Sequence, residues 1–262
     1  MSRTNVKSYF EGHAHNYANR HTEFYSSIMN QIKDIIRTKS NNNNPKFLDV
    51  GCGDGSFIEA LVKAGINMDY FAIDISFKMI TMAKENLVDS NVKLFLADGM
   101  NIPVRQDIKF DIIHIDSVLH HVIERTRGKS TALIKKILEI LVDKLSDNGI
   151  LIVEEWYYSS YIIPTFTSFI VFYGLKLINF LKLDLSFTRE IRPGLEVNIL
   201  HPKQLVKILG TYGSTSLLNK TPTELPKTYK LFLMKESGHI TYILEKGTKL
   251  LRNNNNNYNR SF

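Results

Sequence analysis

A glycine-rich turn at residues 51–55 is the segment whose residue types and spacing predict chemistry most directly. It reads Gly51-Cys52-Gly53-Asp54-Gly55 and follows an apolar run, Phe47 to Val50. Glycine permits a tight turn and lets a ligand approach the main chain closely. Helix-compatible residues come next, so the pattern predicts a strand, a turn and a helix start. Such turns at the carboxyl end of a parallel strand bind nucleotide-like ligands.

Acidic residues stand at the ends of the apolar runs that follow. Asp74 ends the run that starts at Tyr70, nineteen residues after Gly55. This placement suits a second-strand carboxylate that accepts hydrogen bonds from ribose hydroxyls. Asp98 ends the next run, from Val92, and Asp116 lies in the fourth, from Phe110 to His121. Residues 145–155 form a fifth strand-like run with a glycine in its entry turn.

These segments, in this order, resemble the class I methyltransferases that use S-adenosylmethionine. The spacing is G-x-G-x-G with Asp49 two residues before it, whereas the dinucleotide fingerprint is G-x-G-x-x-G. Residues 110–121, Phe110-Asp111 through Leu119-His120-His121, are similar to a pattern of small-molecule methyltransferases of the ubiquinone and menaquinone type. The resemblance covers residues 45–155 and implies an α/β fold. That fold is a Rossmann-like, seven-stranded, mostly parallel sheet with helices on both faces.

The resemblance also implies S-adenosyl-L-methionine as cofactor and no metal. The turn at residues 51–55 would hold the methionine part, Asp74 the ribose and Asp98 the adenine amino group. Asp49 and Asp98 would add negative potential that favours a sulfonium ligand. The implied cofactor-binding residues are Asp49, Gly51, Cys52, Gly53, Gly55, Asp74, Ile75, Asp98, Gly99, Asp116 and Tyr17.

Two histidines are the candidate catalytic residues. His120 and His121 leave the fourth strand close to the expected methyl position, and imidazole titrates near neutral pH. Either could take a proton from an oxygen or carbon acceptor, or both could simply shape the loop. At the end of the fifth strand, alternation places one of Glu154 and Glu155 inward. Glu155 could face the substrate, but the favoured alternative is a carboxylate hydrogen-bonded to neighbouring loops. His13 and His15 are lesser candidates.

The N-terminal flank is expected to form a helical lid. Residues 9–20 are similar to the F-x-x-x-A-x-x-Y-D stretch that opens the quinone-type methyltransferases, where it folds over the cofactor. Tyr17 takes the place of the tyrosine, although the acid after it is missing. Ile28, Ile32, Ile35 and Ile36 recur at helical spacing and predict an amphipathic helix. The alternative is that this region only covers apolar surface.

An uncharged, aromatic-rich stretch follows the fifth strand. Twenty residues from Trp156 to Leu175 carry no charge. Pro164 and several Ser and Thr residues dilute its hydrophobicity, and the sheet continues after it, so a membrane span is disfavoured. We expect residues 156–200 to form an apolar helical cap over an apolar substrate pocket. The stretch could also touch a membrane interface or serve as a buried helix or homodimer contact.

The C-terminal part should complete the sheet. Residues 201–210 predict a helix with Pro202 in its first turn. We expect the sixth strand near Thr215–Asn219 and the seventh at Tyr229–Met234. Residues 236–238 then predict a turn, and Ile240–Leu244 an extra strand. The expected organisation is a lid and Asn-rich linker at 1–44, a cofactor-binding core at 45–155, the cap at 156–200, sheet completion at 201–250 and a disordered tail at 251–262.

Composition narrows the class of protein. The chain has 262 residues, 44% of them hydrophobic, a net charge of +7 and one cysteine. Neither a disulfide nor a signal-peptide core is expected, which fits the cytoplasm or its membrane surface. The favoured function is O- or C-methylation of a small, hydrophobic molecule. An RNA or protein methyltransferase is the alternative suggested by the charge, but the basic residues are dispersed and we expect no nucleic-acid partner. A third alternative is a catalytically silent partner subunit with the same fold.

Overall fold

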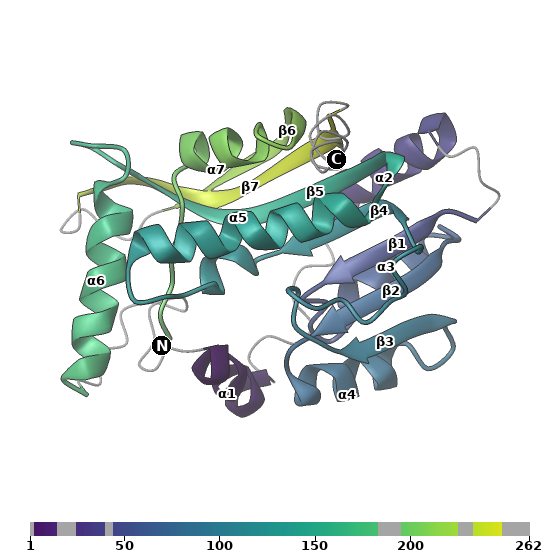
Figure 1. The fold of residues 1–262 in the computed structure, drawn as a ribbon, viewed down its shortest axis with the longest axis horizontal. Helices are drawn as coiled ribbons and strands as arrows, with labels where there is room; N and C mark the ends of the chain where they lie inside the picture. Colours follow the sequence, from purple (N-terminus) through teal and green to yellow (C-terminus); the bar gives the residue numbers. More distant parts are fainter. Residues whose placement is uncertain (1–2, 15–24, 40–43, 183–194, 225–232, 248–262) are drawn as a thin grey trace, which may run out of the picture.

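The computed structural model describes residues 3–14, 25–39, 44–182, 195–224 and 233–247 (Figure 1). Their helices and strands alternate through the first half of the chain, as expected for an α/β protein. The predicted tail at 251–262 and the position of Tyr17 lie outside the described residues.

A seven-stranded sheet forms the centre of the molecule. Its order is β3-β2-β1-β4-β5-β7-β6. Strands β1 to β5 pair in parallel, and β7 runs antiparallel to both β5 and β6. The strands are β1 (Lys46–Val50), β2 (Asp69–Asp74), β3 (Val92–Leu96), β4 (Phe110–Asp116), β5 (Leu145–Ser160), β6 (Gly213–Thr223) and β7 (Met234–Lys246). The predicted Rossmann-like sheet is confirmed.

Helices cover both faces of this sheet. Helices α5 and α7 contribute to the apolar core on one face, and α2, α3 and α4 to the core on the other. The helices are α1 (Arg3–His13), α2 (Tyr25–Lys39), α3 (Ser56–Lys63), α4 (Phe77–Asn86), α5 (Arg127–Lys144), α6 (Phe166–Phe180) and α7 (Pro202–Leu209), with a short 3-10 helix, η2 (Leu119–His121). The strand order reverses between β1 and β4, so a ligand crevice is expected at their carboxyl ends.

The last strand differs from the sequence prediction. Ile240–Leu244 is not an extra strand, because it belongs to β7. Residues 236–238 do not turn but pair with β5, and Ser237 and Gly238 also pair with β6. Gly238 is needed there for close packing, since a Cβ would lie 2.1 Å from the Thr221 carbonyl oxygen. Of the seventh strand predicted at 229–234, residues 229–232 lie outside the described residues.

Strand β5 is longer than predicted and shortens the helical cap. Residues 156–160 pair with β7, so the expectation of a helix from Trp156 onward is wrong for these five residues. Their aromatic side chains suit a pleated, half-buried surface, and Tyr157 and Tyr158 are buried. The helix of this region is α6, which stands at one end of the molecule (Figure 1). None of the described helices has the length and apolarity that crossing a membrane requires.

A buried charge cluster joins the three central strands. His114 on β4 lies between Asp49 on β1 and Glu154 on β5, with both nitrogen–oxygen distances at 2.8 Å. The hydroxyl of Thr241 donates a further hydrogen bond to Glu154, and all these side chains are buried. Burial opposes protonation of the imidazole, but Asp49 and Glu154 outweigh it and raise the pKa of His114 to about 10. His114 therefore carries a positive charge at neutral pH, which compensates the two carboxylates.

We expect the His114→Gln variant to lose about 3–5 kcal/mol of unfolding free energy at pH 7, because two buried carboxylates would lose their counter-charge. The stability from a raised histidine pKa is complete below about pH 6.5 and is lost as the pH rises through 10. The difference between wild type and variant in urea unfolding should therefore shrink from pH 7 to pH 10. An equal difference at both values would mean that the shape of His114, and not its charge, matters.

Candidate active site

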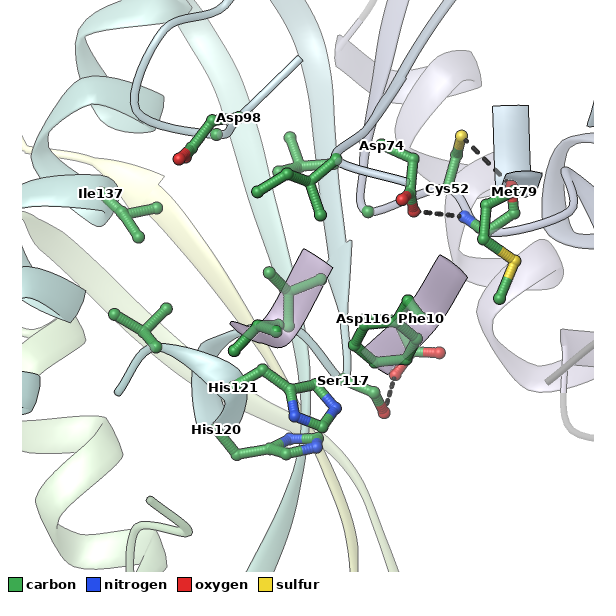
Figure 2. Close-up of a pocket in the computed structure, with 18 of the residues that line it drawn as sticks. Phe10, Cys52, Asp74, Met79, Asp98, Asp116, Ser117, His120, His121 and Ile137 are labelled. Carbon is green, nitrogen blue, oxygen red and sulfur yellow. Dashed lines mark hydrogen bonds between the residues drawn. The ribbon is translucent and has the colours of Figure 1, made fainter. Parts of the chain in front are cut away.

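A cavity of about 290 Å³ lies at the carboxyl ends of β1 and β4, where the strand order reverses. Its lining begins with the ends of β1 and β2 and with the segment after β3, and continues through the residues after β4. Figure 2 shows Asp74 and Asp98 on one side of this cavity and the paired rings of His120 and His121 on the other. The cavity thus has an acidic end and an imidazole-bearing end.

The glycine turn forms the floor of the acidic end. Gly51 and Gly53 have φ angles of +77° and +55°, in the left-handed region that favours glycine. The N–H groups of Gly51 and Cys52 donate to the carbonyl of Ile73, at 2.8 and 3.0 Å, and tie the turn to β2. A Cβ on Gly51 would lie 2.2 Å from Val118, whereas one on Gly53 would meet no protein atom within 4 Å. Gly51 is thus required for packing, and Gly53 leaves open space beside the main chain.

Asp74 stands at the end of β2 beside this turn. Its two carboxylate oxygens accept hydrogen bonds from the N–H groups of Gly53, at 3.0 Å, and Ser76, at 2.8 Å. Burial raises the pKa of Asp74 to about 6. Each oxygen has capacity for another hydrogen bond, so the carboxylate can still accept from a ligand hydroxyl. Asp98, after β3, accepts from the N–H of Met100 at 2.9 Å and also lines the cavity.

Asp116 marks the passage between the two ends of the cavity. Burial, and then the nearby charge of Glu154, raise the pKa of Asp116 to about 7. The next residue, Ser117, has a φ of +54°, which is uncommon for a residue other than glycine. Its hydroxyl donates to Asp116 at 2.8 Å, and its N–H donates to the Glu154 carbonyl at 3.0 Å. This strained turn sends the chain sharply into η2, which carries the histidines.

His120 and Glu155 form a buried pair at the imidazole-bearing end. The Nδ1 atom of His120 lies 2.7 Å from one carboxylate oxygen of Glu155. The other oxygen accepts the N–H of Leu119 at 2.6 Å, which fixes the orientation of the carboxylate. With Nδ1 bound to the carboxylate, Nε2 of His120 is the ring nitrogen left to exchange a proton. Glu155 does not line the cavity, so the expectation that it faces the substrate is wrong. As in the alternative, it is hydrogen-bonded to the neighbouring loop, whereas Glu154 binds His114.

His121 has a different environment from its neighbour. Its ring lies 4.0 Å from that of His120 and 5.0 Å, edge to face, from that of Phe10 on α1. Burial and the proximity of His120 hold the pKa of His121 well below its usual value, so it is neutral at pH 7. Its Nδ1 atom is buried and has no hydrogen-bond partner among the described residues. A neutral imidazole of this kind can hydrogen-bond a polar atom of a ligand.

The remaining walls of this end are apolar. Helix α1 contributes Val6 and Phe10, and the carboxylate of Glu11 holds this helix against the first N–H groups of α4. On the other side lie Trp156, His239 and the extended segment 195–199. Among the described residues, neither Lys nor Arg lines the cavity, and α6 contributes no lining side chain.

Most of the sequence-predicted site residues meet at this cavity. Those that line it are Gly51, Cys52, Gly53, Asp74, Ile75, Asp98, Gly99, Asp116, His120 and His121. Asp49 and Gly55 do not line it. Asp49 binds His114, and Gly55 begins α3, where a Cβ would lie 2.7 Å from Leu87. Tyr17 lies outside the described residues, as does His15, and His13 is exposed on α1.

Sequence reasoning missed the segment 195–199, whose Leu195, Val197 and Ile199 line the cavity. Its alternation of apolar residues with Glu196 and Asn198 was an available signal of extended chain with two distinct faces. The pairing of Asp49 with His114 was also missed, because nothing local in the sequence reports contact between neighbouring strands.

The fold and the cavity together define a Rossmann-like domain built to hold a nucleotide-type cofactor beside an apolar pocket. Residues 48–153 match the family described as "Methyltransferase domain". This part of the chain is thus similar to methyltransferase domains, in agreement with the resemblance that its motifs predicted.

Curated relatives are similar over short parts of the chain. A tRNA (guanine-N(7)-)-methyltransferase of Streptococcus agalactiae is 36% identical over 64 residues, which cover 23% of this chain and 30% of that protein. A malonyl-[acyl-carrier protein] O-methyltransferase of Priestia megaterium is 26% identical over 108 residues, or 41% and 38% of the two chains. The match therefore spans less than half the length of these relatives.

Solved structures are similar over most of the chain. The YcgJ protein of Bacillus subtilis superposes with a TM-score of 0.56 at 13% identity, over 83% of this chain and 98% of that one. Magnesium protoporphyrin IX methyltransferase of Synechocystis, solved with bound S-adenosylmethionine, gives 0.52 at 15% identity, over 92% and 96%. At these identities the likeness establishes the fold.

We expect Gly51→Ala and Gly53→Ala to have different consequences. Both introduce a Cβ at positive φ, which costs about 1–2 kcal/mol. Gly51→Ala should lose about 3 kcal/mol or more, because Val118 must also move. Gly53→Ala should lose only the cost of the positive φ, about 1–2 kcal/mol, and should also weaken ligand binding. Thermal unfolding of both variants tests this, and equal losses would contradict the described turn.

Proposed function

We propose that this chain is a methyltransferase that transfers a methyl group from S-adenosylmethionine to an oxygen or acidic carbon of a small, hydrophobic molecule. One observation carries the proposal. A single cavity joins an end with a glycine turn and the carboxylates of Asp74, Asp98 and Asp116 to an apolar end that contains the His120–Glu155 pair.

The acidic end fits the cofactor. Open space beside Gly53 lets a ligand approach the main chain, and Asp74 retains capacity to accept hydrogen bonds from ribose hydroxyls. Asp98, which also lines this end, would accept a hydrogen bond from the adenine amino group. When bound, S-adenosylmethionine supplies an electrophilic methyl group on a sulfonium, and the three carboxylates favour that positive charge.

The other end fits an acceptor that must lose a proton. Glu155 binds Nδ1 of His120 and orients the imidazole, which leaves Nε2 as the proton acceptor. Neutral His121 would hydrogen-bond the acceptor's polar atom, and Phe10, Trp156 and Val197 would exclude water around it. Helix α1 would then act as the expected lid.

The lining of the cavity disfavours a nucleic-acid acceptor. The described lining residues offer no Lys or Arg for a phosphate, and several carboxylates would repel one. The similarity to the tRNA methyltransferases is limited to 64 residues. Methyl transfer from labelled cofactor into lipid extract, RNA and protein fractions tests the acceptor class. We expect label in the lipid extract, and label in RNA would overturn this part of the proposal.

We expect Asp74→Ala to weaken cofactor binding by about 2–4 kcal/mol in calorimetry, because two hydrogen bonds to a charged acceptor would be lost. Asp69→Ala is the matched control, since Asp69 begins the same strand at its opposite end. Wild-type affinity should also fall as the pH drops through about 6, where Asp74 becomes protonated. An unchanged affinity in Asp74→Ala would remove Asp74 from the cofactor site.

We expect His120→Ala and Glu155→Gln to reduce turnover about 10²–10⁴-fold with the acceptor that the labelling experiment identifies, as for loss of a general base. Cofactor affinity should remain at the wild-type level in both variants. His13→Ala is the control, because His13 is exposed and does not line the cavity. Wild-type turnover in His120→Ala would show that His120 only shapes the loop.

A further inference from the structure

Helix α6 presents an exposed apolar face that the cavity does not use. Phe169, Tyr173, Leu177, Phe180 and Leu181, called the α6 apolar face below, recur at helical spacing and are 38–81% exposed. The loop before the helix adds Tyr161, Ile162 and Ile163, which are 56–66% exposed. Isolated exposed apolar residues are ordinary, but a group of eight on one helix and its loop marks an interaction surface.

The helix is held firmly by its other face. Val171, Phe172 and Leu175 are buried, and Tyr158 on β5 belongs to the same apolar cluster as Val171 and Leu175. Lys176 forms an ion pair with Glu196 at 2.7 Å, with both side chains largely buried. The α6 apolar face is therefore the outer side of an anchored helix.

The charges of this region favour an anionic lipid surface as the occupant. Between Trp156 and Lys182 the chain has neither Asp nor Glu, and of its two lysines Lys176 is paired with Glu196. Lys182 is exposed directly beyond the helix, and the whole chain carries a net charge of +7. A helix with Phe, Tyr and Leu on its outer side, without acids and with a lysine at its end, suits the headgroup boundary of an anionic bilayer.

Helix α6 is bound to a segment that lines the cavity. Glu196, the partner of Lys176, lies between Leu195 and Val197, which both line the apolar end. The side-chain amide of Asn179 also donates to the Leu195 carbonyl at 3.4 Å. The segment 195–199 thus contacts α6 and also lines the apolar end of the cavity, so a surface that binds α6 lies close to the proposed acceptor pocket.

We propose that the α6 apolar face binds the surface of anionic membranes and holds the apolar end of the cavity next to the lipid. The helix lies along the interface and does not cross the bilayer. A hydrophobic acceptor would then reach the cavity from the membrane without passing through water. The binding itself does not depend on methyl transfer, so its test is independent of the proposed function.

Vesicle flotation of the full chain tests the proposal. The probes are vesicles of phosphatidylcholine alone and of phosphatidylcholine mixed with phosphatidylglycerol. We expect wild type to float with the mixed vesicles, less so at high salt. Phe180→Asp and Leu177→Asp should lower the apparent partition coefficient about tenfold or more. Val88→Asp is the matched control, because Val88 is 76% exposed and Phe180 81%, and it should float as wild type does.

Thermal unfolding of each variant shows whether the fold is intact, and exposed positions should tolerate Asp. The proposal is overturned if wild type stays with the unbound fraction or if Val88→Asp and Phe180→Asp lose binding equally. Light scattering provides a further test without vesicles. A wild-type dimer that Phe180→Asp converts to monomer, with no flotation, would assign the α6 apolar face to a second copy of the chain.

Discussion

The ion cluster of Asp49, His114 and Glu154 is the interaction on which the site depends. It spans β1 and β4 just before their carboxyl ends and the middle of β5. Two buried carboxylates without a counter-charge would be strongly unfavourable, so His114 must stay protonated and in place. Val50, Asp116 and Trp156, which lie one or two residues further along these strands, line the cavity. The cluster therefore fixes the two ends of the cavity relative to one another.

The chemistry of the cavity follows from how its two ends differ. At the acidic end, burial raises the pKa values of Asp74 and Asp116 toward neutrality. Such carboxylates gain most from a cationic ligand. At the acceptor end, Glu155 is committed to His120, and the other walls are apolar. The proposed cationic methyl donor and hydrophobic acceptor each match the chemistry of one end.

The sequence predicted the parallel half of the sheet well, because each strand there ends in a residue with a distinct role. Local spacing alone was sufficient to predict the positions of the turn at residues 51–55, of Asp74 and of Asp98. The C-terminal hairpin was predicted poorly, since Gly238 is required by contact with Thr221 and not by a turn. In the same way, residues 156–160 are uncharged like the helix that follows, so the sequence alone did not separate them from it. Their pairing with β7 makes them part of a strand. The pairing of Asp49 with His114 likewise depends on contact between segments that are distant in the sequence.

Crystals of the complete chain with S-adenosylhomocysteine, the demethylated form of the cofactor, would test the central claim most directly. The account predicts ribose hydroxyls within hydrogen-bond distance of Asp74, the adenine amino group beside Asp98, and the sulfur directed toward His120 and His121. Density for the ligand outside this cavity, or a sulfur directed away from the imidazoles, would contradict the assignment of its two ends.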